Sequence, residues 1–292
     1  MGSIRTRREP GQGLQVIVNR IPGDPRPPIL SNKVYHAPSV FTADNLLREA
    51  RRQKSVPVGS VPTICVLDPD GDIVQQLLTT GQAQRNPYWA CYHTVMYTFA
   101  RDGLEYGIIG NVVGAAFAVL VAEELFASGC RLLISMTSAG QITPIGQPPY
   151  FILIERALRD EGTSYHYLPP APYSDIKREL RDRIEGAARS SSLPITHGAT
   201  WTTDAPFRET EAAIVYARSE GILAVEMEAA ALYAFAQAKS QNVVCFAHVT
   251  NQMGNVENDF EKGVAQGSLD ALQVIGLAAH GWVNQVGDAG RF

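Results

Sequence analysis

The stretch VEMEAAALYAFA, residues 225–236, begins with two acidic residues and continues almost entirely with small and apolar ones. The run is rich in Ala and lacks Gly and Pro, so we expect a helix over 226–239 that is buried on most sides. A buried, unpaired carboxylate is very costly, and Glu226 and Glu228 therefore need partners. One candidate is the helix N-terminus, whose free N–H groups favour anions. The other is a ligand that presents hydroxyl groups.

The composition is that of an ordinary globular protein. The chain has 292 residues, of which 45% are hydrophobic and 18% are charged, and its net charge is −4. This mild charge gives no support for binding to nucleic acid or to membrane surfaces. No window holds the roughly 18 apolar residues of a membrane span, and the N-terminus lacks the apolar segment of a secretory signal. We therefore expect a cytoplasmic protein.

The four cysteines give no sign of a metal site. They are far apart and show no Cys/His spacing typical of zinc ligands. Three of them lie in or beside apolar runs, so we interpret them as reduced core residues. We expect no metal and no cofactor. The cysteines are Cys65, Cys91, Cys130 and Cys245.

The sequence predicts an α/β fold with a single domain, built as a mixed central sheet flanked by helices. From residue 33 to 292, continuous apolar runs alternate with helical patterns, which is typical of a sheet covered on both faces. Residues 1–32 are dense in Pro and Gly, and we expect an extended or disordered N-terminal arm there. We expect Asp44 to cap the helix at 43–54. The predicted strands are 63–67, 106–110, 131–140, 196–203 and 242–251, and the other predicted helices are 115–129, 226–239 and about 265–285.

Three predicted strands end in small or polar residues, in IIGNVVG, SMTSAGQ and HVTNQMG. Ligands of open α/β sheets bind beyond the carboxyl ends of the strands. Gly and Ser at these ends allow a ligand to approach the backbone, although they also suit ordinary turns. These segments are candidate walls of a pocket.

Together these segments resemble the nucleoside phosphorylase family, which includes uridine phosphorylase, hexameric purine nucleoside phosphorylase and methylthioadenosine nucleosidase. The resemblance runs from about Val34 to the C-terminus. It implies a nucleoside phosphorylase-like fold, cleavage of the N-ribosidic bond of a nucleoside or nucleoside-like metabolite, and a homodimer or trimer of dimers. Four ordered matches carry it: GIIGNVVGAAFAVLVAEELFASGCRLLISMTSAG at 107–140, TTDAPFRE at 202–209, AVEMEAAALYAFA at 224–236 and HVTN at 248–251.

The resemblance implies roles for the residues of the opening stretch. Met227 would pack on the sugar, and Glu228 would accept hydrogen bonds from the ribose hydroxyls. A carboxylate there also stabilises the positive charge that develops on the sugar when the N-glycosidic bond breaks. Glu226 is explained as well by a structural ion pair as by a contact with the ligand.

Other matched positions are candidates for substrate binding. Ser138, Ala139 and Gly140 are similar to the Ser-Ala-Gly of the nucleosidase branch. Asn251 would lie beside the base, where purine-specific members have an acid. His36, in VYHAPS, resembles a histidine that some members pass to the adjoining subunit. The remaining candidates, in the family's loop after the strand at 196–203, are Phe207 and Arg208.

The phosphate site of the phosphorylases is not recognisable in this chain. Members that use phosphate bind it with arginines, and none of the matching positions is an arginine here. The positions are Gly71 or Asp72, the vicinity of Ser135, and Tyr92 or His93.

Three acids stand where the resemblance would place phosphate: Asp68, Asp70 and Asp72. Carboxylates in a poorly solvated site repel a phosphate anion. We therefore expect water to be slightly favoured over phosphate as the nucleophile, with Asp68 or Asp70 as the general base. A plain turn explains the DPDGD stretch equally well, because Asp, Pro and Gly are turn formers.

Three alternatives remain open. One is a phosphate-dependent nucleoside phosphorylase, for uridine or purine nucleosides, whose phosphate site has moved to Arg85 or Arg208. Another is a nucleoside-binding protein that has kept the sugar site and lost catalysis. The third is a transferase that moves the ribosyl group to another acceptor. Fold alone does not separate these functions.

Overall fold

The structure, a computed structural model, describes residues 4–7, 15–18, 26–188, 194–253, 257 and 259–286. Within these residues the chain forms a ten-stranded mixed sheet in the order β11-β10-β8-β12-β7-β3-β6-β5-β4, with β9 paired to β8. The strands are β3 (Ile64–Asp68), β4 (Ala83–Arg85), β5 (Tyr97–Arg101), β6 (Leu104–Gly110), β7 (Leu132–Gln141), β8 (Tyr150–Asp160), β9 (Tyr173–Asp175), β10 (Ile195–Thr203), β11 (Ile222–Glu226) and β12 (Val243–Asn251).

Part of the sheet closes on itself. β11 pairs in parallel with β10 and also in antiparallel orientation with β7, so that β7, β12, β8, β10 and β11 form a closed ring. A closed ring leaves no unpaired edge among its members. It also brings the end of β11 onto the end of β7, where Val225 is opposite Gly140.

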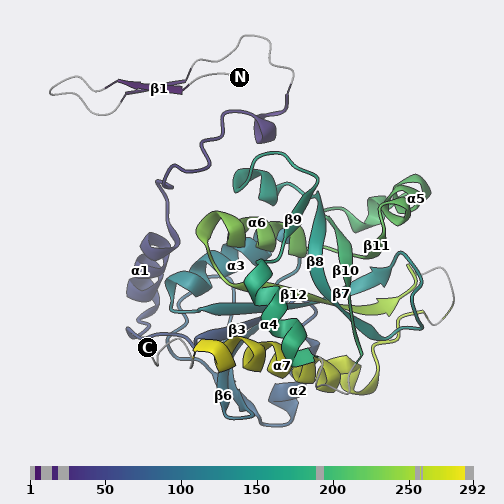
Figure 1. Ribbon diagram of the computed structural model, residues 1–292. Coiled ribbons are helices and arrows are strands. Elements are labelled where there is room, and N and C mark those ends of the chain that lie inside the picture. Colours follow the sequence, from purple (N-terminus) through teal and green to yellow (C-terminus); the bar gives the residue numbers. More distant parts are fainter. Residues whose placement is uncertain are drawn as a thin grey trace.

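Helices cover both faces of the sheet. Figure 1 shows α3 and α6 on one side of the sheet and α4 and α7 on the other. α3 packs against α6, and α4 packs against α7. α1 lies against α3, and α2 lies against α7. The helices are α1 (Ala43–Lys54), α2 (Asp72–Thr79), α3 (Ala115–Ala127), α4 (Arg178–Ala188), α5 (Glu211–Ser219), α6 (Ala229–Lys239) and α7 (Ser268–Val286), with short 3-10 turns η1 (Pro28–Leu30), η2 (Thr163–His166), η3 (Pro206–Arg208) and η4 (Val264–Gly267). No helix of the described residues is long and apolar enough to cross a membrane.

The predicted fold class is confirmed, but two local predictions are wrong. The helix expected over 226–239 begins only at Ala229, because Val225 and Glu226 pair with β10 and belong to the strand β11. Asp44 does not cap α1; the Thr42 side chain does, by accepting a hydrogen bond from the Asn45 N–H. Capping depends on a side chain just outside the helix, which the helical pattern itself does not locate.

The arm predicted over 1–32 is described only in part. Residues 1–3, 8–14 and 19–25 lie outside the described residues. The strands β1 (Ile4–Arg7) and β2 (Gln15–Val18) pair with each other as a separate antiparallel sheet. The boundary between arm and domain stays a prediction.

A tyrosine hydroxyl ties α6 to the sheet. Tyr233, on α6, is fully buried; its hydroxyl donates to the Ile154 carbonyl at 2.5 Å and accepts from the Cys245 N–H at 3.0 Å. A second buried tyrosine, Tyr106 on β6, stacks on Phe99, and its hydroxyl has no partner among the described residues. The two tyrosines thus differ in hydrogen bonding but not in burial.

We expect Tyr233→Phe to lower the free energy of unfolding by about 2 kcal/mol, because it leaves two buried backbone groups short of a partner. Tyr106→Phe is the matched control and should be neutral or slightly stabilising, since it removes a hydroxyl without a partner. Urea unfolding of both variants measures the difference. Equal effects of the two substitutions would contradict the role given to Tyr233.

Candidate functional site

The candidate site lies where several strand ends meet. β3, β6, β7 and β12 run parallel to one another, so their carboxyl ends share one edge of the sheet. At this edge Asp68 is opposite Gly110, and Gly140 is opposite both Asn251 and Val225. The predicted pocket walls therefore come together in space.

Glu226 holds the end of β11 against the start of α6. Its Oε1 accepts hydrogen bonds from the hydroxyls of Thr200 at 3.1 Å and Thr202 at 2.5 Å. Its Oε2 accepts from the backbone N–H groups of Glu228 and Ala229, each at 2.7 Å. These four donors, two on each oxygen, leave little room for a ligand to bind the carboxylate, so we interpret Glu226 as a structural group at the start of α6. Burial raises the pKa of Glu226, and the four donors act against that effect.

Glu228 points to a different place. It is 1% exposed; its Oε1 accepts from the Gly114 N–H at the start of α3, and its Oε2 accepts from the Thr137 hydroxyl on β7, both at 2.6 Å. Burial, and then the neighbouring charge of Glu226, raise the pKa of Glu228 to about 7. Met227, between the two acids, is half-buried.

The acids after β3 form a cluster with a lysine from the far end of the chain. Lys262 Nζ donates to Asp70 Oδ2 at 2.5 Å and to Asp72 Oδ2 at 2.6 Å, and the Ser138 hydroxyl donates to Asp70 Oδ1 at 3.1 Å. Burial acts to lower the pKa of Lys262, but the two carboxylates outweigh it and raise the pKa. The cation of the cluster is thus already shared by two anions.

Asp68 is the buried member of this cluster. It is 2% exposed, its Oδ2 accepts from the Val74 N–H in the first turn of α2, and no side chain is bonded to it within the described part of the chain. Burial raises the pKa of Asp68 to about 7, and the charges of Asp70 and Asp72 add to the effect. A carboxyl with such a pKa is suited to proton transfer near neutral pH.

The Ser-Ala-Gly segment and Asn251 form the opposite wall. Asn251 Oδ1 accepts from the Met253 N–H at 2.9 Å, and Asn251 Nδ2 donates to the Thr250 hydroxyl. A Cβ added to Gly140 would lie 2.5 Å from Met253 Sδ and 3.1 Å from Asn251 Oδ1, so a larger residue would have to displace these two side chains. Ser138 and Asn251 are half-buried, whereas Ala139 is buried. The wall offers an amide and a hydroxyl but no acid.

Several predicted residues are not gathered at this site within one chain. Phe207 is 99% exposed on η3, next to the exposed Arg208. His36 is exposed in the segment before α1. Arg85, at the end of β4, lines a separate cavity with Lys54 and other residues. Their roles stay predictions.

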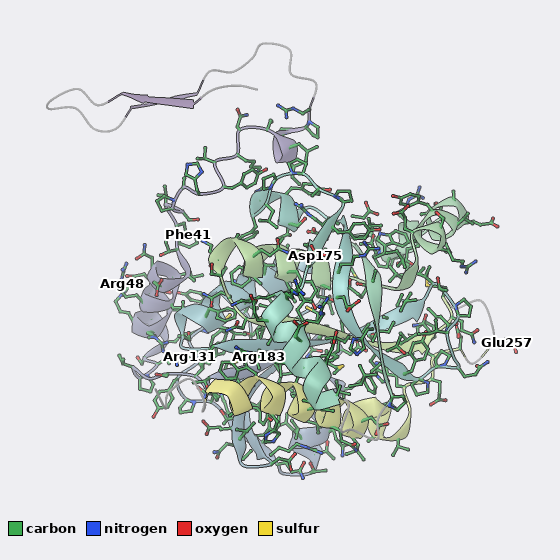
Figure 2. The ribbon with its side chains drawn as sticks, viewed as in Figure 1. Phe41, Arg48, Arg131, Asp175, Arg183 and Glu257 are labelled. Atoms are coloured by element: carbon green, nitrogen blue, oxygen red, sulfur yellow. The ribbon has the colours of Figure 1, made fainter. Side chains whose placement is uncertain are left out.

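Four residues of the site were missed in the sequence. Gly114 and Thr137 hold Glu228, and Lys262 and His248 lie at the acid cluster. His248 stacks on Phe151 and also lines the cavity beside Asp68. No sequence motif connects Lys262 to acids 190 positions away. Its loop leads from β12 to η4 and passes Glu257, labelled in Figure 2 at the edge of the molecule opposite Phe41 and Arg48.

Within the described residues, one group of side chains has the composition of a metal site. Ligand atoms of Glu155 on β8, Glu185 on α4 and His197 on β10 lie within 4.8 Å of one another. The Arg181 guanidinium lies 3.8 Å from Glu155 Oε1 and 3.4 Å from Glu185 Oε1. Arg181 also pairs with Asp182 at 2.8 Å, and His197 Nδ1 lies 3.3 Å from Glu185 Oε1, so we interpret the group as a network of ion pairs.

Comparison with known proteins points to one family. A sequence profile of the phosphorylase superfamily matches residues 63–278. A guanosine phosphorylase of Halorubrum lacusprofundi is 28% identical over 142 residues, which are 47% of this chain and 57% of that protein. Uridine phosphorylase from Vibrio fischeri ES114 superposes with a TM-score of 0.64 at 20% identity, over 77% of this chain and 92% of that one. AMP nucleosidase from Bacteroides thetaiotaomicron VPI-5482 superposes with a TM-score of 0.62 at 19% identity, over 82% of this chain and 96% of that one.

The two superpositions, at such low identity, show a shared fold. The profile match shows membership of the family, because it covers well over half of the chain. The matched region includes β3, β7, β11 and β12 together with the acids of the site. The resemblance drawn from the sequence is thereby confirmed. The chain belongs to the phosphorylase superfamily, whose members are enzymes that cleave N-glycosidic bonds.

Proposed function

We propose that the protein hydrolyses the N-ribosidic bond of a nucleoside or nucleoside-like metabolite, with water rather than phosphate as the nucleophile. The observation that carries this proposal is the acid cluster at the end of β3. Lys262, the one cation of this cluster among the described residues, is engaged by Asp70 and Asp72, and Asp68 adds a third acid. Within the part of the chain that the structure describes, a phosphate ion at this cluster would meet these carboxyl groups and no uncommitted cation, and like charges repel strongly in a poorly solvated site.

Glu228 is the group that we assign to the sugar. Gly114 and Thr137 hold its carboxylate at the strand edge, and the half-buried Met227 beside it offers an apolar surface to the ribose. The carboxylate accepts hydrogen bonds from ribose hydroxyls. It also stabilises the oxocarbenium character of the sugar as the C1′–N bond lengthens, because it is fixed in position before the charge develops.

Asp68 is the general base in this proposal. Asp70 already accepts from Ser138 and Lys262, whereas Asp68 accepts only from backbone N–H groups within the described residues. Asp68 takes a proton from water as the oxygen attacks C1′, and the electron pair of the C1′–N bond leaves with the base. Asn251 assists departure by hydrogen bonding, since its amide cannot protonate the base as an acid would.

The other parts of the proposal rest on the resemblance to the family. The chain needs no cofactor and assembles as a homodimer or a trimer of dimers, with His36 reaching the site of the neighbouring chain. It acts in the cytoplasm, where its four buried thiols stay reduced. A phosphate-dependent reaction is the second candidate, because guanosine phosphorylase is among the similar proteins.

We expect release of free base from a panel of nucleosides to be equally fast with and without added phosphate. Chromatography of the products should show free ribose and no ribose 1-phosphate in either buffer. Release that requires phosphate would overturn the proposal in favour of the phosphorylase. Tight nucleoside binding without any release would favour the non-catalytic alternative.

We expect Glu228→Gln to lower kcat by about 100-fold or more, because it removes a charge that stabilises the transition state. The fold should survive, since Gln can still accept a hydrogen bond from Gly114 or Thr137. Glu226→Gln is the matched control and should mainly lower the melting temperature, because it disturbs the cap of α6. Steady-state kinetics and thermal unfolding of both variants separate the two roles, and equal losses of kcat would contradict them.

We expect kcat/KM to fall as pH drops below about 7, because the raised pKa values of Asp68 and Glu228 mean that both carboxylates take up a proton there. Above this pH both groups are ionised and the rate should reach a plateau. Asp68→Asn should remove most of the activity at every pH. A flat profile from pH 5 to 9, or full activity in Asp68→Asn, would rule out Asp68 as the base.

A further inference from the structure

A groove of about 600 Å³ lies between the start of α1, one side of α3 and the end of α6. Three of its aromatic side chains form a cluster. Phe126 and Tyr167 both meet the ring of Phe235, with centroids 5.7 and 5.8 Å from it. A concave, largely apolar surface of this size is suited to receive apolar side chains. The large apolar residues that line it are Phe41, Leu46, Leu120, Phe126, Tyr167 and Phe235.

Two apolar residues project from the chain beside this groove. Val40 is 99% exposed, and Phe41, at the rim of the groove, is 71% exposed. Figure 2 labels Phe41 at the edge of the molecule, above Arg48 of α1. Single exposed apolar residues are common, but large ones gathered at an apolar groove mark a site of protein–protein contact. The chain thus presents an apolar projection and an apolar groove next to each other.

A projection beside a groove suits a second copy of the same chain. In a two-fold dimer both subunits use the same surface patch, so that each projection enters the groove of the partner. Val40 and Phe41 then leave water in both subunits, and each apolar contact is made twice. Because burial of one large apolar side chain contributes about 1.5–3 kcal/mol, two copies of this pair are a substantial driving force.

The charges of α1 favour the same arrangement. Three acids and one lysine line the groove at the start of the helix, whereas the last turn of the helix is basic. In that last turn Arg51 and Lys54 donate to the backbone carbonyls of Tyr88 and Cys91, which carry no charge. Two α1 helices that run antiparallel across a two-fold axis bring the basic end of each to the acidic groove of the other. The charged residues of the groove are Asp44, Glu123, Glu124 and Lys239.

We propose that Val40 and Phe41 of a second copy fill this groove, across a two-fold axis that sets the two α1 helices antiparallel. The inference rests on the proposed homodimer and names its surface, but it does not depend on whether water or phosphate attacks the sugar. His36 lies five positions before Phe41. An anchored Phe41 therefore keeps His36 within about 18 Å of the partner's groove, since an extended chain spans no more than that.

The first test compares Phe41→Ala with Phe260→Ala in the full-length protein, by sedimentation over a range of concentrations. Phe260 is also 71% exposed but does not line this groove, so it is a matched control. We expect Phe41→Ala to raise the dimer dissociation constant by about 10-fold or more, because it removes most of the apolar surface buried by the ring. Phe260→Ala should leave the constant near the wild-type value. Thermal unfolding checks that both variants are folded.

A second test identifies the surface directly. Val40→Cys and Leu120→Cys chains that carry different tags are co-expressed and treated with oxidised glutathione, to which the four native thiols are poorly accessible because they are buried. We expect a disulfide-linked pair that contains one chain of each kind. A link that forms only when both cysteines are in the same chain would mean that the groove is filled by its own chain, and would overturn the inference.

The outcomes also separate this inference from the proposed function. A wild-type protein that is monomeric at all concentrations overturns both the inference and the homodimer. A dimer that is unchanged in Phe41→Ala uses another face, which overturns the inference and leaves the homodimer standing. Neither test measures release of the base, so failure of the proposed hydrolysis would leave both results as they are.

Discussion

The architecture of the site depends on one buried carboxylate, that of Glu226. It accepts from Thr200 and Thr202 on β10 and from the first N–H groups of α6, so it joins two neighbouring strands to a helix. A carboxylate at this depth is tolerable only because every donor around it is satisfied and the helix terminus favours its charge. The same bonds fix the turn that follows, and that turn aims Glu228 at Gly114 and Thr137 instead of at β10.

The choice of nucleophile depends on a second electrostatic arrangement. The turn after β3 carries three acids, and the loop after β12 supplies one lysine to them. The lysine lowers the repulsion within the cluster without leaving a cation for phosphate. Burial then gives Asp68 a pKa of about 7, so a group that would be fully ionised in water can exchange a proton near neutral pH. The same residue also caps α2, so structure and proposed chemistry share one side chain.

Much of the fold was predictable because buried strands and helices leave strong patterns. The apolar runs at 63–67, 131–140, 196–203 and 242–251 correspond to β3, β7, β10 and β12, with boundaries that differ by at most one residue. The segment at 225–236 was harder, since Ala-rich sequence hides the point where a strand ends and a helix begins. The pairing of Glu226 with Thr202 extends the strand β11 to Glu226, and such pairing is a tertiary interaction. Capping by Thr42 in place of Asp44 is a similar case, set by one hydrogen bond.

The sequence by itself determined the family and the residue types of the site: the two glutamates, the Ser-Ala-Gly segment, and the acids after the first strand of the domain. It also indicated that Glu226 and Glu228 need not serve the same ligand. Only the tertiary structure decided which protein groups bind each of the two glutamates, and that Lys262 pairs with both Asp70 and Asp72. The reason is physical: local pattern reflects burial, whereas the charge and hydrogen bonding of a side chain depend on neighbours that folding brings together from distant parts of the chain.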